Sequence, residues 1–299
     1  AQVTSKDIIE NSVLTTGSYS SSKDSENEEN RENNKEVKFT NRNIHSFNAR
    51  LEFSYATVGE EDNNVKTFVA VPSYSYSFGE FSQHSAGVIL PIRYVDSKDL
   101  FDSELITFNI SPFIKFRLYE KDSIFVEQDH FFIEAGLHGL MHSTLISSTI
   151  FGGAGYLRYG GSIFTAAQWS PSDYLTLRLG VAYQINKVTI LDVISDNFVS
   201  EEFEWLVDTL DDLPEDHEVS FGISFMIPVS NEFSCTLSYF RNNSIGSRVE
   251  DTNAFVSNVS IIFNYLLGNV IDLSIGYKTA FEIENYNEHT IIIGGVFNF

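Results

Sequence analysis

The amino-acid sequence of 299 residues predicts an all-β fold, a transmembrane antiparallel up-and-down β-barrel of about twelve strands. Three observations predict it. Apolar and polar residues alternate along most of the chain, tight connections alternate with longer ones, and charged residues are confined to one of the two alternating faces. A period of two indicates β-strands because successive side chains of a strand point to opposite faces of the sheet.

Alternation begins near residue 44. Phe47, Leu51 and Phe53 share one parity there, whereas Arg50 and Glu52 share the other. Each alternating run is long enough for a tilted strand that crosses a bilayer in about 9–11 residues, and an even number of strands suits a closed barrel. The twelve runs are 44–58, 65–78, 84–95, 104–119, 123–140, 154–169, 174–188, 218–228, 232–243, 253–267, 270–284 and 289–299.

The connections between the runs alternate in length. Every second one is tight, at 79–82, 120–122, 170–173, 229–231 and 268–269. The others are mostly longer, at 59–64, 96–103, 141–153, 189–217, 244–252 and 285–288. Short turns at one rim and longer loops at the other are typical of membrane barrels, so we expect both chain ends at the rim with the short turns.

A large soluble all-β domain is the alternative fold, because half-buried strands also alternate. Pro72, Pro91 and Pro112 favour this alternative, since proline removes a ladder donor and is usually confined to edges or bulges. In a closed barrel we therefore expect a bulge or a strand end at each of these prolines.

Composition excludes several classes of protein. Forty-one acidic residues against 19 Lys and Arg give a net charge of −22, which argues against a nucleic-acid partner. The single cysteine, Cys235, excludes an intrachain disulfide and a cysteine-rich zinc site. No metal site or cofactor is predicted.

Residues 1–43 are polar and almost free of aromatic residues, which predicts a disordered tail ahead of a barrel over 44–299.

If the apolar parity faces lipid, the other parity faces the lumen. Its acidic members are Glu52, Glu134, Asp272 and Glu282. Its basic members, the predicted selectivity residues, are Arg50, Arg93, Lys115, Arg117, Arg158, Arg178 and Lys278. A mildly basic lumen would favour small anions. The other interpretation is a packed lumen in which these charges neutralise one another without conducting anything.

Residues 189–217 form the longest predicted loop, with ten acidic residues and no Lys or Arg. Apolar residues recur within it at helical spacing, and Pro214 would end the helix. This helix could cover the barrel mouth, pack on the rim or bind a partner protein. The predicted partner-binding residues are Phe203, Trp205, Leu206, Leu210 and Leu213.

An enzymatic function is not predicted. His138, His142 and Ser143 are the candidate residues for a Ser–His pair, but adjacent strand residues point to opposite faces. His142 and Ser143 would therefore meet only in a loop conformation.

The last strand carries the one resemblance to a known class. Ile291, Ile293, Gly295, Phe297 and Phe299 share one parity, and the strand ends on that phenylalanine. This arrangement resembles bacterial outer-membrane β-barrels, where a terminal phenylalanine belongs to the assembly signal. The resemblance implies contact with the lipid bilayer, a periplasmic tail and a signal peptide that has already been removed.

Two functions follow as hypotheses. The first is a narrow passive channel of the outer membrane for small solutes, with anions favoured by the basic lumen. The second is a non-conducting scaffold subunit of an outer-membrane complex, which would bind a partner protein through the 189–217 loop or the N-terminal tail.

Overall fold

The computed structural model describes residues 44–58, 63–79, 83–97, 103–126, 129–148, 152–172, 174–192, 216–230, 232–245, 255–267, 271–283 and 286–299. Its strands are β1 (Ile44–Val58), β2 (Asn63–Phe78), β3 (His84–Ile89), β4 (Ile92–Asp96), β5 (Ser103–Asp122), β6 (His130–Ser148), β7 (Gly152–Ser172), β8 (Leu175–Asp192), β9 (Asp216–Pro228), β10 (Phe233–Ile245), β11 (Phe255–Leu267), β12 (Ile271–Ile283) and β13 (Tyr286–Asn298). Within these ranges no helix has the length and apolar character needed to span a membrane.

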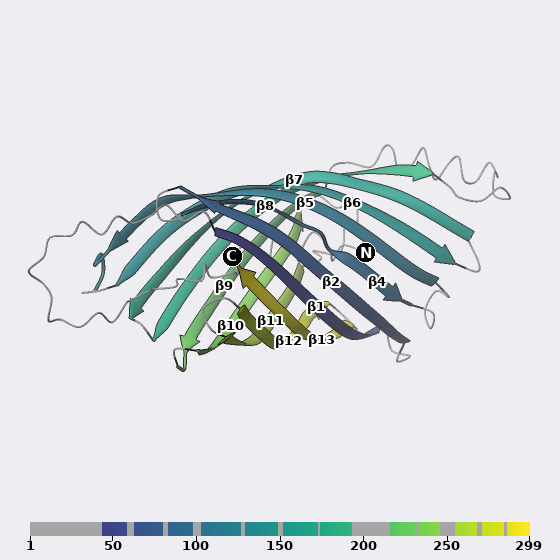
Figure 1. Cartoon of the computed structure of the whole chain (residues 1–299). Helices are drawn as coiled ribbons and strands as arrows, with labels where there is room; N and C mark the ends of the chain where they lie inside the picture. Colours follow the sequence, from purple (N-terminus) through teal and green to yellow (C-terminus); the bar gives the residue numbers. More distant parts are fainter. Residues whose placement is uncertain are drawn as a thin grey trace, which may run out of the picture.

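The strands form one closed antiparallel barrel. Neighbours in sequence pair with one another, and β13 pairs with β1 along its whole length, so that the sheet has no free edge (Figure 1). β3 and β4 both lie between β2 and β5 and are two parts of one interrupted strand. The barrel therefore has twelve strands, and the predicted fold is confirmed.

The predicted irregularity occurs at one of the three prolines. Leu90 and Pro91 separate β3 from β4, and the Leu90 N–H donates to the Pro72 carbonyl at 2.9 Å. In a strand, the N–H and C=O groups of one residue point to the same neighbouring strand. Pro72 has no N–H, so the position where that donor would lie faces the gap between β3 and β4. Pro72 and Pro112 themselves lie inside continuous strands.

The prediction was wrong about the bounds of the fifth run, 123–140, which corresponds to β6. β6 runs from His130 to Ser148, and a turn precedes it. The expected long loop at 141–153 is consequently strand at both ends, with only 149–151 between β6 and β7. The connection at 284–285 is equally tight. The regular alternation of short and long connections therefore does not hold, although the longest connections, 193–215 and 246–254, do share one rim.

One side chain organises the turn between β5 and β6. The Asp129 carboxylate accepts hydrogen bonds from the backbone N–H groups of Ile124, Phe125 and Val126 at 2.7, 2.9 and 3.1 Å. It also accepts one from Trp169 Nε1 at 2.9 Å. Burial raises the pKa of Asp129, but these four donors outweigh burial and hold its pKa below the ordinary value.

The two faces of the barrel wall differ as the alternation predicts. Outward side chains are mostly large, apolar and exposed, such as Phe53 at 47% and Ile275 at 57%. Charged residues are not confined to the inner face as expected, because Lys66 and Lys187 lie on the outward parity. Inward side chains are mostly polar and buried, such as Gln184 and Ser224, which have no exposed surface. An apolar band around a whole molecule is costly in water and is stable when lipid covers it.

Aromatic rings gather at the rim where β1 begins and β13 ends. The His45 N–H donates to the Phe299 carbonyl, and the Phe299 N–H donates to the His45 carbonyl, both at 2.9 Å. The two rings stack with centroids 5.7 Å apart. Phe125 contacts Trp169 edge to face at the same rim, with centroids 5.7 Å apart. Aromatic girdles of this kind mark the boundary between hydrocarbon and headgroups in membrane barrels.

Two predictions fall on residues outside the described ranges. The first is the tail at 1–43, and the second is the helix with Phe203, Trp205, Leu206, Leu210 and Leu213. Both remain predictions, as does the scaffold function that depends on them. Of the predicted loop, residues 189–192 and 216–217 belong to β8 and β9 instead.

Candidate channel lining

All seven predicted basic residues lie on the inner face of the wall, but they do not form one ring. The structure distributes them among separate clusters, most of them built around a glutamate. The exposed fraction of these side chains ranges from 1% for Arg178 to 28% for Lys115.

The first cluster surrounds Glu134 on β6. Arg178 Nη2 of β8 donates to Glu134 Oε1, and Lys115 Nζ of β5 lies 3.5 Å from Oε2. β7 lies between β6 and β8, and the residue opposite Glu134 on it is Ala166. Gly180 follows on β8, so small side chains leave the arginine room to reach across β7.

The second cluster surrounds Glu52 on β1. Arg50 Nη2 of the same strand lies 2.7 Å from Glu52 Oε1, and Lys278 Nζ of β12 lies 3.3 Å from Oε2. Arg93 of β4 is within electrostatic reach of the same carboxylate. One carboxylate, 3% exposed, thus faces cations from three strands.

The third cluster contains an acid that the sequence interpretation missed. Arg158 Nη2 of β7 donates to Glu218 Oε1 of β9 at 3.1 Å, and Asn242 Nδ2 donates to Oε2 at 3.1 Å. Glu218 is 1% exposed. Its inward parity with Ser220 could have identified it, but it stands beside the acidic stretch that was taken for a loop.

Arg117 is held differently from the other six. Its Nη1 lies 3.1 Å from Glu120 Oε2 on the same strand, and its guanidinium lies 4.0 Å from the centre of the Phe132 ring. An arginine over an aromatic face gains a cation–π attraction in addition to its ion pair. This group lies at the rim near the β5–β6 turn.

The lumen also has an apolar part that the sequence interpretation missed. Phe164, Ala182 and Phe240 form one buried cluster. A second consists of Val69, Val71, Ile89 and Leu140, with Phe113 packed against it. These side chains share the parity of the inward polar residues, so the inner wall is polar only in part.

The clusters carry a net charge when all their groups are ionised. Glu134 and Glu52 each form ion pairs with two cations, which leaves one positive charge around Glu134 and, with Arg93 also near Glu52, at least one around Glu52. The expectation of paired lumen charges and that of a basic lumen are therefore compatible. Pairing fixes the positions of the cations, and the excess cation of each cluster adds positive charge to that part of the wall.

The candidate histidines do not form a catalytic pair. His142 is buried on the inner face of β6, and Ser143 has the opposite parity on the same strand. His138 is 4% exposed and lies between aromatic rings, 5.5 Å from Phe113 and 5.3 Å from Phe164 between centroids. Across the described strands and turns, no three His, Cys, Asp or Glu residues are placed to hold a metal ion.

Comparison with known proteins agrees with this architecture. No family model matches the chain, and no curated protein matches it. An outer membrane channel from Pseudomonas putida F1 is similar, with a TM-score of 0.57 and 12% identity over 86% of this chain and 96% of the channel. The translocator domain of the autotransporter NalP from Neisseria meningitidis has a TM-score of 0.51 and 14% identity, covering 88% and 91%.

The transport unit of the autotransporter AIDA-I from Escherichia coli is also similar, with a TM-score of 0.53 and 10% identity over 89% of this chain and 93% of that unit. Likeness at such identities concerns the fold. The chain has the fold of bacterial outer-membrane β-barrels.

Proposed function

We propose that this protein is a narrow passive channel of the bacterial outer membrane that favours small anions. The observation that carries the proposal is the charge of the lumen wall, where Glu52 and Glu134 are each held between two cations. Fixed positive charge on a low-dielectric wall raises the local concentration of anions and disfavours cations.

Two further observations support it. The apolar side chains of Phe164 and Phe240 project inward together with the charged clusters, which favours a narrow path over a wide pore. Barrels of few strands leave little space beyond their own side chains. One of the similar structures is itself an outer membrane channel.

The test is ion selectivity in a planar bilayer under a KCl gradient. Lys115→Gln removes the most exposed cation of the Glu134 cluster and leaves the Arg178–Glu134 pair without excess charge. We expect its reversal potential to shift away from the equilibrium potential of chloride and towards that of potassium. Charge reversal by Lys115→Glu should shift it further in the same direction.

The matched control is Lys66→Gln, which removes an exposed cation from the outward face of β2. Its reversal potential should equal that of the unmodified protein. An unchanged reversal potential in both Lys115 variants would contradict the proposal, as would a folded barrel that conducts nothing.

A further inference from the structure

A pair of glycines interrupts the apolar outer wall of the barrel. Gly139 on β6 lies directly opposite Gly161 on β7. The next outward pair along the same strands is Leu137 with Ile163, whose side chains are 54% and 55% exposed. Large side chains thus stand beside two positions that have none.

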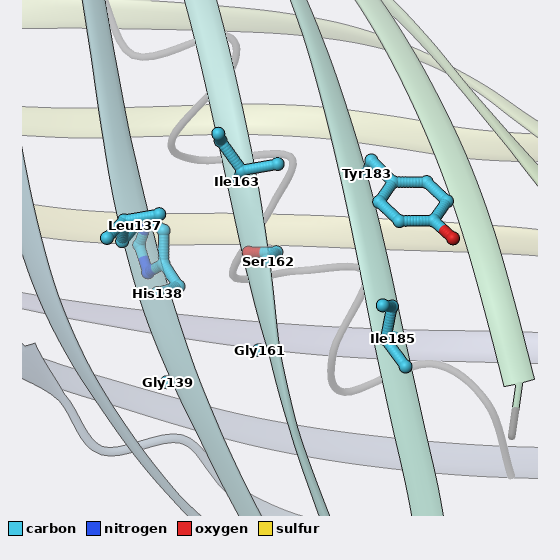
Figure 2. A pocket seen from close by; sticks show the side chains of 8 residues that line it. All are labelled: Leu137, His138, Gly139, Gly161, Ser162, Ile163, Tyr183 and Ile185. Carbon is cyan, nitrogen blue, oxygen red and sulfur yellow. The ribbon is translucent and has the colours of Figure 1, made fainter.

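The interruption is a notch with a volume of about 360 Å³. Tyr183 and Ile185 of β8 line its far side, and Figure 2 shows their side chains beside the bare backbone at Gly139 and Gly161. The notch is open to the surroundings over most of its extent, so it suits a chain that lies along the wall and does not enclose a ligand. Because the notch lies in the apolar band, a hydrocarbon chain is the material that suits it.

A polar edge adjoins the notch. The register places Gly161 opposite Ile185, and Ile185 opposite His217 of β9, so all three lie in one row across the wall. Lys187 is exposed and shares the outward parity of Ile185 on the same strand. The Tyr183 hydroxyl is 2.7 Å from His217 Nδ1, and the two rings stack.

This edge faces the rim away from the chain end at Phe299. The long connections 193–215 and 246–254 join strands at that far rim. In outer-membrane barrels the longer loops are extracellular. Lys187, two residues beyond Ile185 towards that rim, therefore lies on the side of the notch that faces the outer-leaflet headgroups, and His217 lies beside the notch in the row of Gly161 and Ile185.

The charge of this edge differs from that of its counterpart across the barrel. Lys66 is the outward cation on β2, and its partner in the register is Asp96, which in turn lies opposite Glu104. Lys187 lies opposite Tyr159 on β7, as Lys66 lies opposite Tyr55 on β1. The register of β8 with β9 ends at Asn186, so the neighbour of Lys187 on that side lies outside the described residues. In a chain with a net charge of −22, a lysine and a histidine together at the membrane surface favour an anionic headgroup.

We propose that the notch and its polar edge bind a phosphorylated glycolipid of the lipid A type from the outer leaflet. An acyl chain lies over Gly139 and Gly161, and a phosphate group accepts hydrogen bonds from Lys187 Nζ and the His217 ring. Charge-assisted bonds to phosphate hold the headgroup, and the apolar notch fixes one chain. The inference rests on the outer-membrane location in the proposed function, but not on conduction.

The test measures the affinity of the purified full-length barrel, in detergent, for bisphosphorylated hexa-acyl lipid A. The double variant Lys187→Gln/His217→Gln should bind it about tenfold or more weakly, because two phosphate contacts are lost. Gly161→Leu fills the notch and should weaken binding as well. Its Cβ would meet one neighbour closely, the His138 carbonyl oxygen at 3.2 Å.

Matched controls lie elsewhere on the outer face. Lys66→Gln removes a cation that has an acidic residue opposite it, and Gly295→Leu adds a side chain whose Cβ has no neighbour closer than 3.6 Å. Both should bind lipid A as the unmodified barrel does. The heat-dependent mobility of folded barrels in gels confirms that each variant has folded.

Unchanged affinity in the folded double variant would overturn the proposal. Phosphatidylglycerol that binds as tightly, with the same loss in the double variant, would overturn it in favour of ordinary phospholipid. Lipid binding and conductance are separate readouts. A barrel that conducts ions but does not bind lipid A contradicts the proposed lipid site and leaves the channel proposal standing. A folded barrel that binds lipid A but does not conduct ions contradicts the channel proposal alone.

Discussion

Replacing Glu134 by glutamine removes the negative charge from the most buried charge cluster of the lumen and keeps the size of the side chain. Arg178 and Glu134 are only 1% and 2% exposed, and Lys115 is the second cation on the same carboxylate. After the substitution both cations face a neutral amide, and Arg178 retains its charge at every accessible pH.

The expected cost follows from this burial. Breaking a buried ion pair by removing one partner typically costs about 3–5 kcal/mol, because the remaining charge is left uncompensated. We expect Glu134→Gln to lower the free energy of unfolding by about that amount, chiefly through Arg178. Lys115 adds less because water reaches part of its side chain.

The assay is equilibrium unfolding by guanidinium in lipid vesicles, followed by tryptophan fluorescence. The control is Glu120→Gln at the rim, where Arg117 and Glu120 are 15% and 30% exposed. An exposed pair contributes about 0–1 kcal/mol. Equal losses in the two variants would refute the reasoning. The double variant Glu134→Gln/Arg178→Gln should recover part of the loss, since the buried positive charge that faced the carboxylate is then removed as well.

Three other predictions follow from single positions. Phe240→Ala removes a fully buried lumen side chain, so it should cost about 3–5 kcal/mol in guanidinium unfolding and raise the single-channel conductance. Gly160→Ala would place a Cβ 2.1 Å from the Ile185 carbonyl oxygen, so its refolding yield should fall far below that of Gly295→Ala, where no atom lies within 3.6 Å. The depressed pKa of Asp129 means that its ionised form stabilises the fold above the unfolded-state pKa of about 3.9 and that this stabilisation is lost as pH falls through the folded-state value. Unfolding measured against pH should therefore depend less steeply on acid in Asp129→Asn than in the unmodified protein.

Period-two alternation predicted what depends on neighbouring residues in sequence. It placed Arg50 and Glu52 on the inner face and Phe47 on the outer face, and it gave the number of strands. The face on which a strand residue lies is a local property, because each residue reverses the direction of the one before it. The inward position of the seven basic residues was predictable for this reason.

Strand β6 shows where the local pattern fails. Ile124 and Val126 alternate as strand residues do, yet they belong to a turn whose backbone N–H groups donate to the Asp129 carboxylate. That carboxylate also accepts a hydrogen bond from Trp169, forty residues further along the chain. The polar stretch after Met141 was taken for a loop, although a lumen-facing strand tolerates polar side chains on its inner face. Both errors come from contacts that the sequence alone does not reveal.

The pairing of the lumen charges depends on the closed barrel itself. Arg178 meets Glu134 across an intervening strand, and Lys278 meets Glu52 across another. Which inward residues come level with one another depends on strand tilt and stagger, which alternation does not specify. The inward basic residues were predictable individually, and the clusters that they form, including the one around Glu218, were not.

The central claim is that the lumen is an open path with excess positive charge. Its most direct test is the reversal potential of single channels formed by the purified barrel in a planar bilayer under a KCl gradient. We predict reproducible conductance steps and a reversal potential closer to the equilibrium potential of chloride than to that of potassium. A folded barrel without steps, or a reversal potential on the potassium side, would contradict the claim.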